Sequence, residues 1–167
     1  MVMFDVFGPY DVPVSQAPRG LFFDAPDIER FWRQCPEIAE RRGCYVFALR
    51  SARGATPSYV GKAAVQTFEA EVFSADKQNK YIEALVQRER GRPEMYFVPC
   101  PVARGRVNES VIREVETFLI RLAAAINPSL INVHGTTPDA WAIKGALRGG
   151  PGKPSAAAAA FKQVMGL

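Results

Sequence analysis

The alternation of hydrophobic and polar positions predicts a group of short strands in the middle of the chain. Runs rich in β-branched and aromatic residues occur three times, at 44–49, 58–61 and 94–99. The connection between the first two runs contains glycine, serine and proline, so these runs are expected to form an antiparallel hairpin. The first 25 residues mix glycine, proline and aspartate with aromatic residues, which predicts an extended arm held by burial of its aromatic rings.

Apolar residues at helical spacing predict helices around these strands. An amphipathic helix is expected over residues 27–41, where Pro36 interrupts or restarts it, and residues 64–90 also favour helix. The clearest periodicity follows Asn108, a candidate N-cap. Its apolar stripe consists of Val111, Val115, Phe118, Leu119, Leu122 and Ile126. Near the end of the chain, Ser155 is placed to begin a short alanine-rich helix.

These elements predict an α+β fold with a small three-stranded, mostly antiparallel sheet flanked by helices. We expect residues 1–42 to form an arm and helix that pack on the core, and residues 43–134 to form that core. Residues 135–167 are expected to form a basic extension rich in glycine, proline and alanine that includes the short helix. A length of 167 residues suits one domain, and 48% hydrophobic residues are enough to bury a core.

Composition excludes several classes of protein. No apolar run approaches the roughly 20 residues of a membrane-spanning helix, and three scattered cysteines without a C-x-x-C pair predict neither disulfides nor a zinc site. We therefore predict a cytoplasmic protein that does not interact with membranes. The chain has 21 basic and 17 acidic residues, and the basic excess lies after residue 42. This charge permits a polyanionic partner without requiring one.

Two strand tyrosines next to glycines are the first candidate chemical groups. Tyr45 ends the sequence Gly-Cys-Tyr, and Tyr59 begins Tyr-Val-Gly-Lys, which places Lys62 beside the second motif. Glu116 borders the apolar stripe of the long helix, where Arg113 is the helix neighbour placed to pair with it. A carboxylate bordering a core needs a partner, a metal ion or a raised pKa, unless it reaches solvent. Asn132 follows this helix, where a turn or cap residue is also expected.

The order of these residues resembles the GIY-YIG nuclease family over residues 43–134. The resemblance rests on the two tyrosine motifs, the helical Glu-Thr-Phe-Leu-Ile at 116–120, and Pro128 followed by Asn132. It implies a divalent-metal-dependent endonuclease that cuts DNA, with Mg²⁺ or Mn²⁺ held by Glu116. By this resemblance Tyr45 activates or orients the attacking water, Tyr59 places a second hydroxyl near the phosphate, Lys62 neutralises phosphate charge and Asn132 maintains the geometry.

One residue expected from the family is missing. The family has an arginine in the helix after the second motif, whereas this chain has Glu69 and Glu71 there and no arginine between 53 and 88. Lys77 or Lys80 could supply the cation instead, or Glu71 could join Glu116 at a metal ion.

Other basic residues extend the candidate nucleic-acid surface. Lys77 and Lys80 flank Tyr81, which indicates either a phosphate-contacting face with a stacking ring or a solvated helix face with Tyr81 turned inward. Further candidates for backbone contacts are Arg88, Arg90, Arg92, Arg104, Arg106, Lys144, Arg148 and Lys153. The sequence also leaves open two alternatives on the same fold. One is a catalytically impaired nucleic-acid-binding module, and the other is an interaction domain that docks a protein partner through the arm and Trp141.

Overall fold

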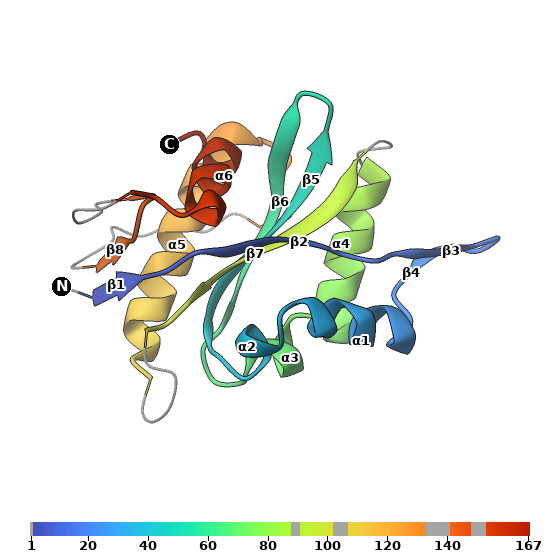
Figure 1. The fold of residues 1–167 in the computed structure, drawn as a ribbon. Helices are drawn as coiled ribbons and strands as arrows, with labels where there is room; N and C mark the ends of the chain where they lie inside the picture. Colours follow the sequence, from blue (N-terminus) through green and yellow to red (C-terminus); the bar gives the residue numbers. More distant parts are fainter. Residues whose placement is uncertain (1, 88–90, 102–106, 133–140, 148–152) are drawn as a thin grey trace.

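The computed structural model describes residues 2–87, 91–101, 107–132, 141–147 and 153–167, apart from the side chains of Trp141 and Ala142. It is an α+β fold built on a four-stranded antiparallel sheet in the order β2-β7-β5-β6 (Figure 1). These strands are β2 (Phe7–Asp11), β5 (Gly43–Ser51), β6 (Gly54–Ala63) and β7 (Arg92–Pro99). As expected, β5 and β6 form an antiparallel hairpin, with a register shift after Phe47.

The sheet has one strand more than the sequence predicts, and that strand comes from the N-terminal arm. β2 pairs with the outer edge of β7, matching Phe7 to Phe97 and Tyr10 to Met95. Gly8 and Pro9 break the alternation by which a strand is recognised, and an edge strand tolerates a proline because one side of its backbone has no partner. The expectation of a three-stranded sheet is therefore wrong for this chain.

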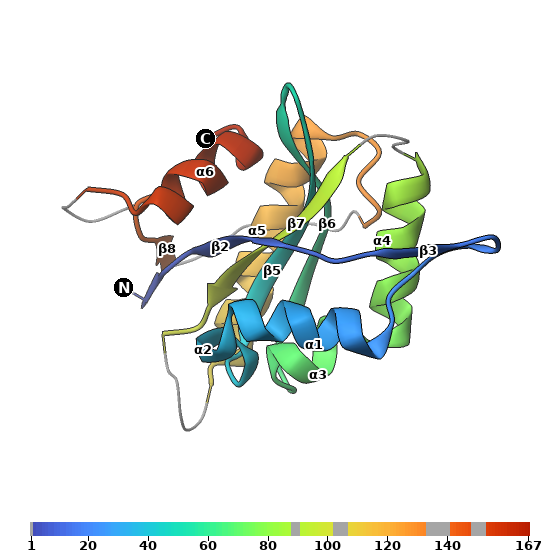
Figure 2. The same ribbon diagram turned by 45° about the vertical axis from the view of Figure 1, so that its right-hand side comes forward.

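Helices cover both faces of the sheet (Figure 2). One face packs against α1 (Ala25–Gln34), α2 (Pro36–Ala39), α3 (Phe68–Glu71) and α4 (Ala75–Gln87). The other packs against α5 (Glu109–Ile126) and α6 (Ala156–Met165). Successive residues of β5 alternate between the two cores, because strand side chains point to opposite faces in turn.

The helix boundaries follow local capping chemistry. The side chain of Asn108 accepts hydrogen bonds from the backbone of α5, as the sequence predicts, and Ser155 caps α6 in the same way. Pro36 restarts the first helical segment as α2 after a break at Cys35. The helical region expected over 64–90 forms two helices, and Thr67 caps the first of them.

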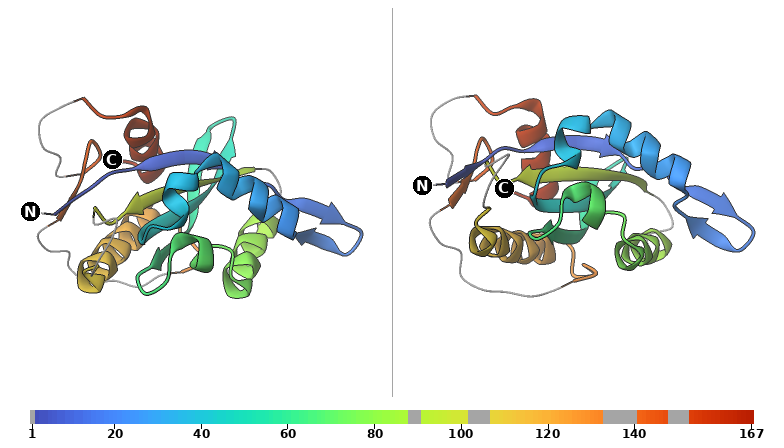
Figure 3. Two further views of the ribbon diagram at one scale, coloured as in Figure 1. Left: turned by 60° about the horizontal axis from the view of Figure 1, so that its bottom comes forward. Right: turned by 90° about the horizontal axis from the view of Figure 1, so that it is seen from below.

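Shorter strands lie outside the main sheet. β1 (Val2–Phe4) pairs in parallel with β8 (Trp141–Ile143). β3 (Ser15–Ala17) and β4 (Gly20–Phe22) form a hairpin that projects beyond the helices (Figure 1, Figure 3). Within the described parts of the chain, no helix combines the length and apolar character needed to cross a membrane.

Candidate active site

Both motif glycines stand where a side chain does not fit. A Cβ on Gly43 would lie 2.3 Å from the backbone oxygen of Val98, and φ at Gly43 is +155°. A Cβ on Gly61 would lie 2.4 Å from Cζ of Tyr45, its cross-strand partner. The Tyr45 ring thus covers Gly61, and the two motifs fit together through direct packing.

The motif tyrosines belong to an aromatic cluster on the α3 and α4 side of the sheet. Ring centroids of Tyr45 and Tyr59 are 6.2 Å apart, and Tyr59 is 5.9 Å from Tyr81. Tyr81 is fully buried, stacks on Phe47 at 4.5 Å, and donates a hydrogen bond to the carbonyl oxygen of Val72 at 2.7 Å. Tyr81 is therefore a core residue, and the expectation that it stacks on a base is corrected.

Tyr45 and Tyr59 keep their protons at neutral pH. Burial raises the pKa of the Tyr45 hydroxyl well above its usual value, and the neighbouring Tyr81 and Tyr59 add to the shift. Burial also raises the pKa of Tyr59, while nearby Lys77 acts in the opposite direction. The Tyr45 hydroxyl has no hydrogen-bond partner of good geometry among the described residues, although it is fully buried. Buried hydroxyls normally have a partner, and Tyr81 is the neighbour whose side-chain hydrogen bond contributes to the raised pKa of Tyr45.

On the other side of β6, Lys62 and Glu116 form an ion pair. The ammonium group of Lys62 donates to Oε2 of Glu116, across 54 residues of sequence. The side chain of Glu116 is 14% exposed and that of Lys62 is 35% exposed. Arg113, the partner expected for Glu116 within α5, pairs instead with Glu109 at 3.4 Å. Glu116, the candidate metal ligand, is thus paired with Lys62, which is itself a candidate site residue.

Asn132 binds the outer edge of β6 through its side chain. Its Oδ1 accepts a hydrogen bond from the Val60 amide at 3.2 Å, and its Nδ2 donates to the Val60 carbonyl at 2.6 Å. Just before it, the backbone amide of Ile131 donates to the carbonyl of Ser58 at 3.1 Å. The segment after α5 therefore pairs with β6 in place of another strand and holds the middle of the strand that carries Tyr59 and Lys62.

Lys77 and Lys80 differ in their relation to the site. The Lys77 side chain is 17% exposed, 2.9 Å from Asp76 and 3.5 Å from Glu71, and it interacts with the Tyr59 hydroxyl. Burial opposes its charge, but the hydrogen bond to Asp76 and the neighbouring acidic groups outweigh burial and raise the pKa of Lys77. Lys80 is 34% exposed and lies 3.7 Å from Asp76. Lys77 is the lysine that joins the cluster.

These contacts place the candidate residues around one edge of the sheet, with β6 between α5 and α4 (Figure 1). Burial is the main cause of the raised pKa of Tyr59; Lys77 lowers it and the charge of Glu116 raises it slightly. The structure thus places Tyr59 and Lys62 on the edge strand β6, Asn132 and Glu116 against that strand, and Tyr45 on the neighbouring strand β5 beside Tyr59.

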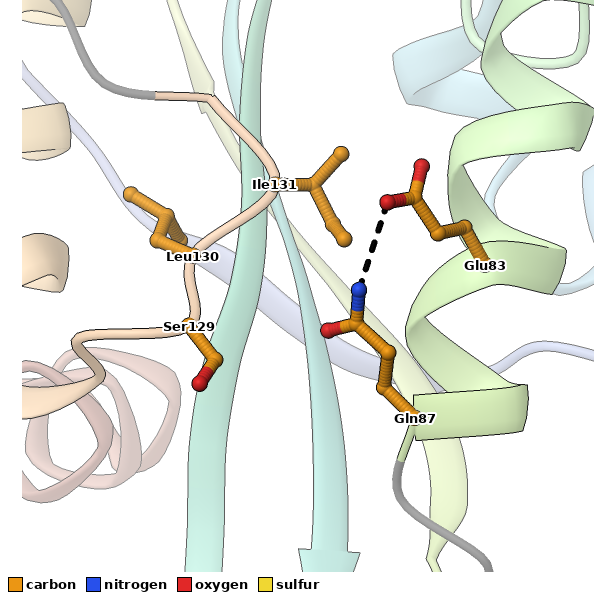
Figure 4. A pocket seen from close by; sticks show the side chains of 5 residues that line it. All are labelled: Glu83, Gln87, Ser129, Leu130 and Ile131. Atoms are coloured by element: carbon orange, nitrogen blue, oxygen red, sulfur yellow. Dashed lines mark hydrogen bonds between the residues drawn. The ribbon is translucent and has the colours of Figure 1, made fainter.

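An open cavity of about 560 Å³ continues this edge. It lies between α4 and the turn after α5 and is lined by Glu83, Gln87, Ser129, Leu130 and Ile131. Figure 4 shows Ile131 pointing toward Glu83 and Gln87, whose side chains are hydrogen-bonded to each other at 3.2 Å. Among the described residues, its lining has one charged side chain, the carboxylate of Glu83.

Basic residues gather at the opposite end of the hairpin. A second cavity, of about 570 Å³, is lined by Arg50, Arg53 and Arg92 together with Ser51, Ala52 and Gly91. Arg50 binds the buried carboxylate of Glu94 through two hydrogen bonds, of 2.6 and 3.0 Å. The other predicted backbone contacts at 88, 90, 104, 106 and 148, and the side chain of Trp141, fall outside the described residues.

The donor set fits a hard divalent ion held by one protein ligand. No group of three or more His, Cys, Asp or Glu side chains that could hold a metal ion is found in the described parts of the chain. Mg²⁺ binds through one or two carboxylates and keeps several waters, so the partly exposed Glu116 is the candidate site carboxylate that could hold one. Glu71 is held by Lys77, on the opposite side of β6 from Glu116.

Comparison with known proteins identifies no relative: no family model, curated protein or solved structure matches the chain.

Two contacts of the site were not predicted from the sequence. The Lys62–Glu116 pair depends on how α5 packs against β6, and no local pattern encodes it. The Asp76–Lys77 pair could have been predicted, because adjacent residues of opposite charge are a local signal.

Proposed function

We propose that this chain is a divalent-metal-dependent endonuclease that hydrolyses DNA phosphodiester bonds, with a GIY-YIG-like site at the edge of β6. One observation carries the proposal. Lys62 and Glu116, singled out from sequence order and 54 positions apart, form an ion pair, the rings of Tyr45 and Tyr59 lie 6.2 Å apart, and Asn132 bonds the backbone of the strand that carries Tyr59 and Lys62.

Each residue then has a physical task. A divalent ion at Glu116, when bound, supplies positive charge against the negative charge that develops on the phosphate. Lys62 adds a point charge on the same side of β6. The protonated hydroxyl of Tyr59 donates a hydrogen bond to a phosphate oxygen, and that of Tyr45 orients a water molecule. Their raised pKa values keep both hydroxyls protonated at neutral pH, so neither is available as a general base.

Lys77 takes the place of the missing helix arginine. Its partly buried ammonium group lies beside Tyr59, and its raised pKa keeps it charged. A lysine provides a point charge but not the bidentate contact of a guanidinium group, so weaker orientation of the phosphate is expected.

Electrostatics favours a metal ion at this site. The ion-paired groups are three lysines (Lys62, Lys77 and Lys80) and three carboxylates (Glu71, Asp76 and Glu116), which leaves no net formal charge. These groups therefore do not attract a phosphodiester by their net charge, and a divalent ion, when bound, would supply the positive charge that does.

The ion pairs also support a second candidate function. Both site lysines are already neutralised by carboxylates of the same chain, which is the arrangement expected of a structural network. A non-catalytic nucleic-acid-binding or protein-interaction module on this fold would retain such pairs.

A cleavage assay separates the two candidates. Supercoiled plasmid and single-stranded DNA are incubated with wild type, Glu116→Gln or Glu109→Gln, in Mg²⁺, Mn²⁺ or EDTA. Glu109 is a matched control, because it is a carboxylate on the same helix paired outside the site. We expect metal-dependent cutting that falls about a hundredfold or more in Glu116→Gln and persists in Glu109→Gln.

Either of two results rejects the nuclease. The first is cutting that is undiminished in a folded Glu116→Gln variant. The second is absence of cutting in every metal with salt-dependent DNA binding retained, which selects the non-catalytic module.

A further inference from the structure

The carboxylate proposed to bind metal is already bound by a cation of the same chain. Lys62 Nζ donates to Oε2 of Glu116, and among the described residues no other ion pair involves either side chain. A metal ion at Glu116 must displace this ammonium group or share one carboxylate with it. In both cases the positive charges of the metal ion and the Lys62 ammonium group repel each other.

The same lysine is suited to move. It lies on the edge strand with 35% of its side chain exposed, whereas Glu116 is 14% exposed and belongs to a helix packed on the sheet. A lysine head group sits on a flexible four-carbon stem, so it can leave one anion for another nearby. The phosphate of a bound nucleic acid is the anion that the proposed function brings to this edge.

We propose that Lys62 exchanges between Glu116 and the substrate phosphate, so that the metal ion and the nucleic acid each strengthen the binding of the other. This inference rests on the proposed function and adds a coupling within that site. Without nucleic acid, Lys62 holds Glu116 and weakens metal binding. A phosphate draws Lys62 away and exposes the carboxylate, and by linkage a bound metal ion frees Lys62 for the phosphate.

Direct measurement of Mn²⁺ binding tests this coupling without relying on cleavage. Mn²⁺ affinity is measured by electron paramagnetic resonance, with and without a short phosphorothioate single-stranded DNA that resists cutting. The proteins are wild type, Lys62→Met, Glu116→Gln and Lys80→Met. Lys80 is a close control because it is 34% exposed and interacts with a carboxylate, Asp76, that is not the proposed ligand.

The coupling makes opposite predictions for the free and the DNA-bound protein. In wild type, DNA should raise Mn²⁺ affinity by about 5- to 20-fold, the lower part of the range for coupled sites. Lys62→Met should bind Mn²⁺ about 3- to 10-fold more tightly than wild type without DNA, because a competing cation is gone. In Lys62→Met, DNA should raise the Mn²⁺ affinity by a factor of about two or less. Lys80→Met should show the wild-type Mn²⁺ affinity and, at saturating DNA, the wild-type increase in that affinity, whatever effect the lost charge has on DNA binding itself.

The outcomes distinguish failure of the coupling from failure of the nuclease proposal. If Glu116→Gln loses Mn²⁺ binding while Lys62→Met behaves as wild type, the exchange is rejected and the metal site stands. Weaker Mn²⁺ binding in free Lys62→Met also rejects the exchange, because Lys62 then supports the metal site. If Glu116→Gln binds Mn²⁺ as wild type does, Glu116 is not the ligand, and both the exchange and the proposed metal site fail.

Discussion

The fit of the Tyr45 ring over Gly61 predicts a large cost for adding one methyl group. In Gly61→Ala, the new Cβ would lie 2.4 Å from Cζ, 2.5 Å from the hydroxyl oxygen and 2.9 Å from Cε1 of Tyr45. These distances are about 1 Å short of ordinary carbon contacts. Tyr45 is fully buried against Phe68 and Tyr59, so the ring cannot move without disturbing its neighbours. Overpacking of this kind costs about 1–3 kcal/mol.

The assay is urea unfolding followed by circular dichroism, supported by thermal melting. Gly61→Ala should lower the melting temperature by about 2–12 °C for a chain of this size. A double-mutant cycle then identifies the cause. In a Tyr45→Phe background the cost should persist, because phenylalanine keeps Cζ and Cε1. In a Tyr45→Leu background, where those atoms are gone, it should fall below about 0.5 kcal/mol. An equal cost in wild type and Tyr45→Leu would refute the proposed clash.

Three further predictions concern stability. Asn132→Ala should lower the free energy of unfolding in urea by about 1–2 kcal/mol, because both hydrogen bonds to the Val60 backbone are lost. An unchanged midpoint would contradict that role. Arg50→Ala should cost about 2–4 kcal/mol by the same assay, because Glu94, only 1% exposed, loses its charged partner. A cost under about 1 kcal/mol would count against the pair. Burial raises the pKa of Cys35 from 9.0 to about 12. The stability that this raised value contributes is complete below pH 9 and is lost as the pH rises toward 12. Urea midpoints should therefore fall less steeply in this range for Cys35→Ala than for wild type, and parallel curves would contradict the shift.

Elements with strong local patterns could be predicted from the sequence. The strand runs at β5, β6 and β7, and the apolar stripe and cap of α5, are continuous signals, and each gave an element in the expected place. β2 has no such signal, because its pairing depends on β7, which lies more than 80 residues later. Edge pairing of this kind follows from the assembled sheet rather than from periodicity.

The candidate site likewise contains residues that could be predicted from the sequence and contacts that could not. Tyr45, Tyr59 and Glu116 stand out by residue type and order, but their surroundings depend on tertiary packing. Tyr81 was counted among the nucleic-acid-binding residues because the flanking lysines suggested an exposed face, although a ring turned inward was the stated alternative. The buried Ala84 one turn later marks the inward face on which Tyr81 lies. Charge is a weak guide to the face of a helix when apolar residues at helical spacing point elsewhere.

The pairing of β1 with β8 and of β2 with β7 has a consequence for folding during synthesis. Val2 lies opposite Trp141, so the first strand is made about 140 residues before its partner. At about 5–20 residues per second, the ribosome needs roughly 7–28 s to supply that partner, and β2 waits for β7 for more than half of that time. During this interval the early strands have no sheet to join. We therefore expect the nascent chain to be most prone to aggregate before β7 emerges, and the N-terminal strands to be the last part of the sheet to gain protection from hydrogen exchange.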